Sequence, residues 1–117
     1  MDISSLFISP TQTLRNALST LNDGVLKLVL VVDEKKSLIG TLTDGDVRRG
    51  ILNGFSLDDS VKKIMNQNFK YAKSTDKKEK VLRIMREYSL RQIPVLDSEK
   101  RVLRILLFKD IISTSRC

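Results

Sequence analysis

The stretch LVLVVDEKKSLIGTLTDGDV, residues 28–47, holds two apolar runs that a charged turn separates, and it ends in Thr-Asp-Gly-Asp. The stretch QIPVLDSEKRVLRILLFKDI, residues 92–111, follows the same plan 64 positions later without a gap. Asp46 falls on Asp110, and apolar residues fall on apolar residues between the identities. Such internal similarity at a fixed offset is typical of one structural unit used twice. We therefore expect a duplicated fold with a pseudo-twofold axis.

Apolar spacing on either side of these stretches predicts the same order of elements in both copies. The first copy is expected to contain a helix over residues 11–21, strands over 28–32 and 38–42, and a helix over 44–52. The second copy is expected to contain a helix over 81–88, strands over 93–96 and 102–107, and a final helix from about Lys109. A short helix around 61–65 and a brief strand over 71–73 are expected between them. This order predicts an α/β (α+β) fold with two small sheets, each covered by helices.

Several residues predict local details of these elements. Thr11 or Thr13 is expected to cap the first helix, because hydroxyl side chains satisfy free amides at a helix start. Asp76 with Glu79 is expected to form a capping box for the helix of the second copy. Pro94 lacks an amide hydrogen, which suggests that its strand lies at the edge of a sheet or is irregular.

Length and composition bound the class of protein. A chain of 117 residues is of single-domain size, so we expect units 1–58 and 59–117 to form one folded body. The hydrophobic fraction of 41% and the charged fraction of 30% are typical of a soluble globular protein. No apolar run is long enough to span a bilayer, and no secretory signal is visible. The single cysteine, Cys117, fits a reducing, cytoplasmic setting.

The net charge of +7 has two interpretations. It indicates either a basic surface that meets an anion or lysines that are simply solvated. No aromatic pair or zinc-finger spacing accompanies the lysines, so we expect no nucleic-acid binding, and we expect no membrane binding. The chain has no histidine, which removes the most common general base. We expect no enzymatic activity and no metal.

The chemistry of the sequence is concentrated at Thr43-Asp44-Gly45-Asp46, where a strand leads directly into a helix. Unpaired amides at a helix start favour an anion such as phosphate, and a carboxylate can accept hydrogen bonds from a ribose diol. The same Thr-x-x-Asp pattern also describes an ordinary capping box. Taken alone, these residues favour the capping box, and the ligand site is the alternative.

The residues over 31–33, 38–47 and 93–97 together resemble the signature of the CBS domain, named after cystathionine β-synthase. The resemblance covers nearly the whole chain and implies a tandem pair, or Bateman module, which commonly forms homodimers. Such pairs bind adenine nucleotides (AMP, ADP or ATP) or S-adenosylmethionine and regulate an attached enzyme or transporter. Residues 43–50 are similar to CBS pairs that precede sugar-phosphate nucleotidyltransferase domains. The alternative function is a ligand-free dimerisation scaffold for the partner enzyme.

The resemblance also implies roles for individual residues. It implies a phosphate contact for Thr43, ribose contacts for Asp46, and a position lining the base or ribose for Thr41. A phosphate-facing role for Lys27 follows in the same way. The opposite wall of this cleft would come from the second copy, through Tyr71, Ala72, Ile93 and Pro94. In the second copy Leu107 replaces Thr43 and only Asp110 survives, so we expect that cleft to be empty or altered.

Overall fold

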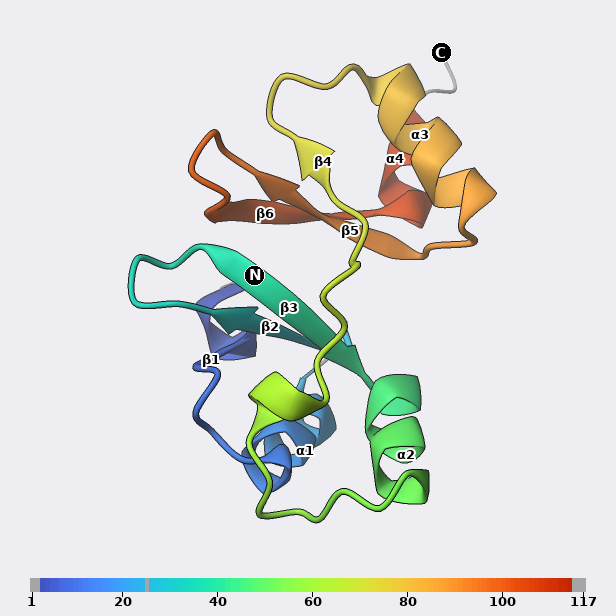
Figure 1. The fold of residues 1–117 in the computed structure, drawn as a ribbon. Coiled ribbons are helices and arrows are strands. Elements are labelled where there is room, and N and C mark those ends of the chain that lie inside the picture. The colour runs from blue at the N-terminus through green and yellow to red at the C-terminus, as the bar shows by residue number, and fades with distance from the viewer. Residues whose placement is uncertain (1–2, 25, 115–117) are drawn as a thin grey trace. The chain divides into compact units, whose positions relative to one another are not determined.

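The computed structural model describes residues 3–24 and 26–114, which fall into two compact units (Figure 1). The first unit runs to Phe69 and the second begins at Lys70. Residues 59–69, which the division at 58/59 gives to the second copy, thus belong to the first unit. The reason is packing, because Val61, Ile64 and Met65 join the core of the first unit. Cys117 lies outside the described residues.

The first unit is a three-stranded sheet with helices. Its sheet has the order β1-β2-β3, in which β1 runs parallel and β3 antiparallel to β2. Along the chain its elements are the 3₁₀ helix η1 (Ile3–Leu6), β1 (Phe7–Ile8), α1 (Leu14–Asp23), β2 (Leu28–Val32), β3 (Leu38–Thr43), α2 (Asp44–Leu52) and the 3₁₀ helix η2 (Val61–Lys63).

The second unit repeats this plan with the same strand order and directions. Its elements are β4 (Ala72–Lys73), α3 (Lys78–Glu87), β5 (Gln92–Leu96), β6 (Val102–Leu107) and α4 (Phe108–Thr114). The helices α3 and α4 and the strands β5 and β6 each begin at the position that the sequence offset assigns to their counterparts. The duplicated α+β architecture predicted from the sequence is confirmed.

The repeat extends to the hairpin turns. Asp33 and Asp97 each accept two backbone amides through Oδ1, from the residues two and four positions further on. Lys36 and Lys100 both adopt positive φ, of 69° and 64°, which these tight turns require. The bulge in each hairpin also lies at the equivalent place, between Val31 and Val32 and between Val95 and Leu96.

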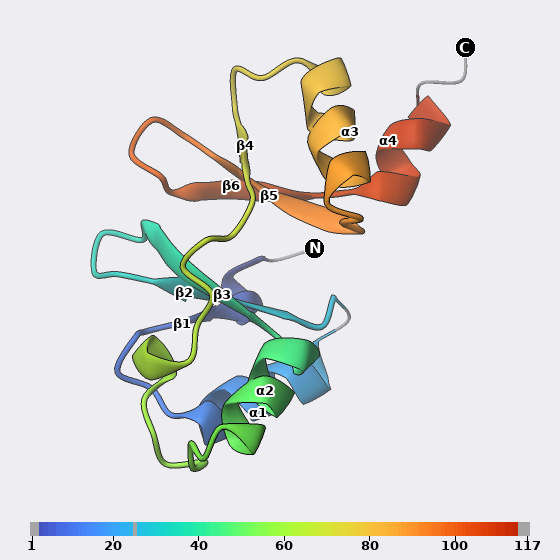
Figure 2. The ribbon, with the colours of Figure 1, turned by 45° about the vertical axis from the view of Figure 1, so that its right-hand side comes forward.

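Each unit has its own hydrophobic core, built on one face of its sheet (Figure 2). In the first unit α1 and α2 share that face, with Leu14, Ala17 and Leu21 fully or almost fully buried. These residues fall at the i, i+3 and i+7 positions of an amphipathic helix, as predicted. The core of the second unit uses Val81, Met85 and residues of β5 in the same way.

One local prediction was wrong, and another held only in part. β5, which carries Pro94, is the central strand of its sheet and not an edge, whereas the irregularity that was the other expectation is present as the register shift between Val95 and Leu96. The proline is tolerated because β4 pairs only with Val95 and Leu96, so the ladder on that side begins after Pro94. Asp76 forms no capping box with Glu79, since Lys77 is the N-cap residue of α3 and makes no side-chain cap bond.

Strand β1 was not predicted, although its counterpart in the second unit was. The two residues of β1 carry too little periodicity to be recognised, and their pairing with β2 defines the strand. The first helix is capped by Thr13, one of the two residues expected, and ends at Gly24.

Candidate functional site

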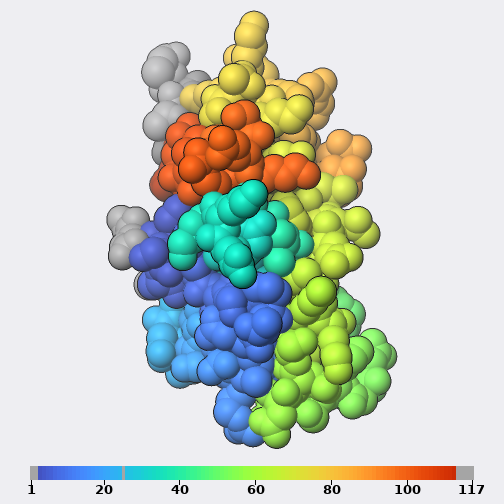
Figure 3. Space-filling model, turned by 60° about the vertical axis from the view of Figure 1, so that its left-hand side comes forward, coloured from blue at the N-terminus to red at the C-terminus, as the bar shows by residue number. Residues whose placement is uncertain are grey.

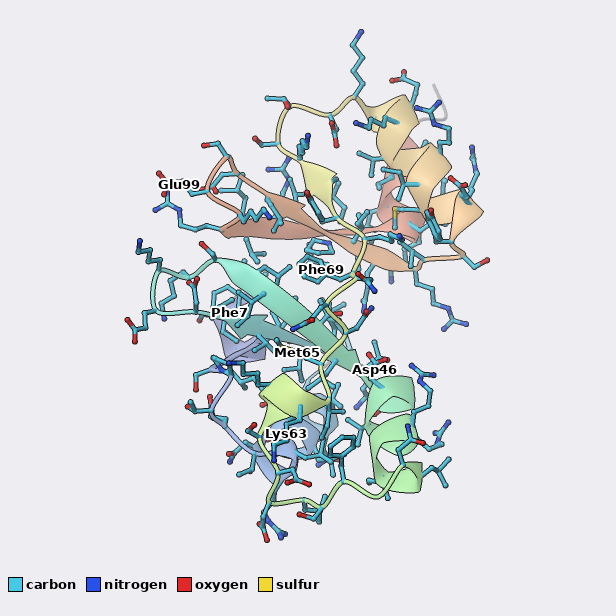
Figure 4. The ribbon with its side chains drawn as sticks, in the orientation of Figure 1. Phe7, Asp46, Lys63, Met65, Phe69 and Glu99 are labelled. Atoms are coloured by element: carbon cyan, nitrogen blue, oxygen red, sulfur yellow. The ribbon has the colours of Figure 1, made fainter. Side chains whose placement is uncertain are left out.

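The candidate site lies where β3 ends and α2 begins. Thr43 is the N-cap residue of α2, and Asp46 is the third residue of that helix (Figure 4). The amide and the hydroxyl of Thr43 donate to Asp46 Oδ2 at 3.0 and 3.1 Å. The amide of Asp46 donates back to Thr43 Oγ1 at 3.4 Å. The structure therefore contains the capping box that the sequence allowed.

The Asp46 carboxylate accepts a third hydrogen bond, from a residue that was not predicted to contact it. Arg49 Nη2 donates to Asp46 Oδ1 at 2.6 Å, one helical turn further along α2. The Asp46 side chain is 15% exposed, whereas that of Arg49 is 68% exposed. The i,i+3 spacing of the two residues was the available signal. Because Arg49 is solvated, this ion pair is exchangeable, while the bonds to Thr43 are built into the helix start.

The hydrogen-bond inventory of Asp46 decides what the site can bind. A carboxylate offers about four lone-pair positions. Within the part of the chain that the structure describes, Oδ2 uses two of them for Thr43, and Oδ1 uses one for Arg49. One position is left, and displacement of Arg49 releases a second on the same side of the carboxylate. Two acceptor positions match the two hydroxyls of a vicinal diol, as found in ribose.

Thr41 lies on β3 two residues before Thr43 and is 7% exposed. Its backbone pairs with Leu30 of β2 on one side and with Asn66 on the other. Thr41 N donates to Asn66 O at 3.1 Å, and Asn66 N donates to Thr41 O at 2.8 Å. The segment after η2 is thereby fixed against the outer edge of β3 within the first unit.

Gly40 allows this segment to approach the sheet. A Cβ atom at Gly40 would lie 2.4 Å from Met65 Sδ and 3.0 Å from Met65 Cβ. Figure 4 labels Met65 next to the first sheet. The glycine therefore serves packing inside the first unit. The equivalent position of the second unit carries Arg104, which is exposed.

Lys27 makes its contacts at the end of α1. Its Nζ donates to the carbonyl oxygens of Leu21 and Asn22, at 3.1 and 3.4 Å. These are carbonyls of the last helical turn, where a cation is favoured. In this structure the ammonium of Lys27 is engaged by the protein itself.

The second-unit residues of the expected cleft come from two neighbouring strands. Ala72 on β4 pairs with Val95 on β5. Because the two strands are parallel, Tyr71, one residue before Ala72, lies next to Pro94, one residue before Val95. Ala72 and Ile93 are fully buried. The structure thus groups Tyr71, Ala72, Ile93 and Pro94 at one end of the parallel pair.

Asp110 lies in the first turn of α4 and is exposed. Leu107 stands where Thr43 stands in the first unit, so this helix start has no hydroxyl to form the box. The two helix starts are chemically different despite their common fold.

A surface groove of about 710 Å³ lies elsewhere on the first unit. It is lined by residues 7–12 and 32–36, which Figure 3 shows side by side in blue and blue-green. This groove is at the hairpin end of β3, opposite the end that carries Thr43 and Asp46. No sequence pattern predicted this groove.

Carboxylates with lowered pKa lie in turns away from Thr43. Backbone hydrogen bonds from Arg101 and Glu99, together with the Arg101 side chain, lower the pKa of Asp97. A backbone hydrogen bond from Lys73 and the nearby Lys80 lower the pKa of Asp76.

Among the described residues there is no group of three or more side chains suited to a metal ion. In the same part of the chain, no helix has the length and apolar character needed to cross a bilayer.

Two copies of a small mixed sheet with helices on one face, joined in tandem, define a class of paired α+β modules. The model of the CBS domain family matches residues 1–53 and 61–116, so the chain belongs to this family and is a tandem CBS pair.

Curated relatives are larger proteins. The chain is 29% identical over 100 residues to an uncharacterized protein of Helicobacter pylori strain J99, covering 85% of this chain and 30% of the relative. It is 26% identical over 108 residues to inosine-5'-monophosphate dehydrogenase of Methanocaldococcus jannaschii, covering 90% of this chain and 20% of the relative. The chain thus spans less than a third of the length of these relatives.

Solved structures share the fold. The cytosolic domain of the Mg²⁺ channel MgtE, solved in complex with ATP, is 25% identical with a TM-score of 0.79, covering 93% of this chain and 44% of that one. A CBS domain pair solved with 5'-methylthioadenosine and S-adenosyl-L-methionine is 22% identical with a TM-score of 0.77, covering 93% and 86%.

Proposed function

We propose that this chain is a regulatory module that binds an adenine nucleotide at Thr43 and Asp46. The observation that carries the proposal is the carboxylate of Asp46, held by Thr43 at a helix start and paired, among the described residues, otherwise only with the solvated Arg49. Support also comes from the channel domain solved in complex with ATP, which is 25% identical to this chain.

The proposed binding step uses groups of this chain in defined roles. The ribose diol displaces Arg49 and donates to Oδ1 of Asp46. The hydroxyl of Thr43 turns from Asp46 toward a phosphate oxygen, and the first amides of α2, which have no intrahelical acceptor, face the same anion. Thr41 lines the base or ribose. A role in binding for Tyr71, Ala72, Ile93 and Pro94 of the second unit is proposed on the family resemblance alone.

Lys27 is proposed to contact a phosphate only after it gives up its present hydrogen bonds. To reach a phosphate, its ammonium must leave the carbonyls of Leu21 and Asn22. The Asp110 site is proposed to be the weaker one, because Leu107 offers no hydroxyl. S-adenosylmethionine is the other ligand proposed for the same position, since it shares the ribose diol and the adenine.

The regulated partner is proposed to be an attached or separate nucleotidyltransferase, on the similarity of residues 43–50 to CBS pairs that precede such domains. Control requires that the nucleotide bind two arrangements of the pair with different affinity. We propose a cytoplasmic homodimer as the working assembly.

A thermal-shift panel of AMP, ADP, ATP and S-adenosylmethionine tests the proposal. A ligand at 100 times its Kd raises the free energy of unfolding by about 2.7 kcal/mol. For a domain of this size the expected rise in Tm is about 10 °C. Asp46→Asn should abolish the rise, because an amide offers one acceptor oxygen instead of two.

The matched control is already built into the chain. The α1 start is a capping box of Thr13 with Asn16, so Asp46→Asn is expected to keep α2 folded. Asp110→Asn, at the equivalent position of the second unit, should leave the ligand response in place. A response that is equal in wild type and Asp46→Asn would exclude the proposed site.

The second candidate function is a dimerisation scaffold that works without ligand. Ile51 and Leu52, at the end of α2, are 48% and 78% exposed, which favours a contact with another chain. Sedimentation of wild type and Leu52→Glu tests this candidate. A dimer that Leu52→Glu dissociates, combined with no response to the nucleotide panel, would favour the scaffold.

A further inference from the structure

The excess of positively charged residues in the chain lies entirely in its second unit. Residues 1–69 contain eight Lys or Arg and eight Asp or Glu, so the first unit is neutral overall. Residues 70–117 contain thirteen Lys or Arg and six Asp or Glu, which accounts for the whole charge of +7. Two copies of one fold therefore differ by seven charges.

Lysines of the second unit are concentrated at the end of β4 and the start of α3. Four exposed lysines occur close together in the chain, and we call them the lysine surface: Lys73, Lys77, Lys78 and Lys80. Asp76 and Glu79 lie among them, so residues 73–80 carry a net charge of +2, against +1 for the equivalent residues 9–16. The carboxylate of Asp76 is engaged within the turn. Its Oδ2 accepts from the amide of Lys73 at 2.8 Å, and its Oδ1 pairs with Lys80 Nζ at 3.3 Å.

The first unit shows that this turn does not need lysines. There the amide of Ser9 donates to Gln12 Oε1 at 2.8 Å, and Lys73 and Asp76 make the same bond at the equivalent positions of the second unit. The two turns have the same geometry, but Ser9 and Gln12 carry no charge. The charges of the second turn are thus additional to what the fold requires.

The start of α3 is also capped less well than the start of α1. α1 begins with a capping box of Thr13 and Asn16. α3 has Lys77 and Lys80 at those positions, and Lys77 makes no side-chain cap bond. Lysine is a poor cap, and cations at a helix start oppose the helix dipole, an effect that Glu79 in the first turn of α3 partly offsets. A sequence that keeps lysines where they destabilise the helix indicates a role in binding.

From these observations we propose that the lysine surface binds an acidic protein surface or segment. Charge complementarity requires an anion, and the structure favours carboxylates of a protein over nucleic acid or membrane. The exposed aromatic ring of this unit, Tyr88, carries Lys70 Nζ 4.4 Å from its centroid, and Arg86 lies over Phe108 at 5.9 Å. Tyr88 is the C-cap residue at the other end of α3, and residues 73–80 contain no aromatic side chain on which a base of single-stranded nucleic acid could stack. None of the four lysine positions adjoins an exposed large apolar side chain in sequence, as a membrane-binding surface usually has.

The test uses the full chain and a fluorescent polyglutamate peptide as the probe, measured by anisotropy at about 50 mM salt. The binding variant replaces three lysines with the residues of the first unit, as Lys73→Ser, Lys77→Thr and Lys80→Asn. The control variant removes three exposed cations of the first unit, as Lys35→Ser, Lys36→Asn and Lys62→Ser. Both variants lose three positive charges, and circular dichroism with urea unfolding checks that both are folded.

We expect the binding variant to lose affinity about tenfold, since three exposed ion pairs contribute a factor of about two to three each. The control variant should lose less than about threefold. Equal losses in the two variants, or no polyglutamate binding by wild type, would overturn the proposal. So would tighter binding to a single-stranded RNA of matched length or to phosphatidylglycerol vesicles with the same dependence on the three lysines. The proposal does not depend on the nucleotide site, and Asp46→Asn should bind polyglutamate like wild type.

Discussion

The contact between Gly40 and Met65 gives the sharpest test of the first unit. Gly40→Ala would place a Cβ atom 2.4 Å from Met65 Sδ, 2.6 Å from its Cγ and 3.0 Å from its Cβ. Non-bonded carbons normally lie about 3.5 to 4.0 Å apart, so Met65 must move by about 1 Å. Movement is restricted, because the neighbouring Asn66 is held to Thr41 by two backbone hydrogen bonds.

Overpacking of this kind costs about 1–3 kcal/mol. Alanine restricts the unfolded chain more than glycine does, which offsets about 0.5 kcal/mol of this cost. We therefore expect Gly40→Ala to lower the free energy of unfolding by about 1–2 kcal/mol, or the Tm by about 5–10 °C. Urea unfolding followed by circular dichroism measures the change.

A double-mutant cycle separates this clash from other effects. Met65→Ala removes the crowded side chain, so the double variant with Gly40→Ala should be more stable than the sum of the single changes by about 1 kcal/mol. Arg104→Ala, at the equivalent exposed position of the second unit, should change stability by less than about 0.5 kcal/mol. Additive effects in the cycle, or a Gly40→Ala variant as stable as wild type, would refute the reasoning.

Two further predictions concern the second unit. Lys77→Asp supplies the missing cap of α3 and a negative charge that suits the helix dipole. The free energy of unfolding, measured with urea, should therefore rise by about 1 kcal/mol. No rise would show that residue 77 is not the N-cap. Asp97 has a lowered pKa, mainly through the backbone amides of Arg101 and Glu99, so its contribution to stability is present above its unfolded pKa near 3.8 and is lost as pH falls below that value. Asp97→Asn should therefore be less stable than wild type at pH 7 and lose less stability between about pH 4 and pH 2; identical acid slopes would contradict the assignment.

Local sequence patterns predicted most of the elements because their causes are local. The apolar spacing of α1 and the runs of β2 and β3 are visible in a few residues each, and the repeat supported each assignment a second time. β1 was missed because two residues become a strand only through their pairing with β2. The central position of β5, which carries Pro94, could not be predicted from the sequence either, because it depends on where β4 begins and ends.

The candidate site shows the same limit. The sequence identified Thr43 and Asp46 at a strand-to-helix junction, and it left a capping box and a ligand site as alternatives. The structure contains the box, and it adds Arg49 as the exchangeable partner of Asp46. The engagement of Lys27 with α1 was not predictable, because it depends on the positive φ of 55° at that residue and on the end of the preceding helix. The grouping of Tyr71 with Pro94 follows from strand register, whereas their role opposite Thr43 rests on the family resemblance.

An NMR titration of the full chain with AMP, ADP and ATP in turn tests most directly whether an adenine nucleotide binds at the start of α2. We predict that the backbone amides of Thr43 and Asp46 shift most, together with those of Tyr71 and Ile93, and that Asp46→Asn removes these changes. The Asp110 amide should shift little. Shifts confined to Asp110 and its neighbours, or a spectrum that none of the three nucleotides changes, would show that no adenine nucleotide binds at Thr43 and Asp46.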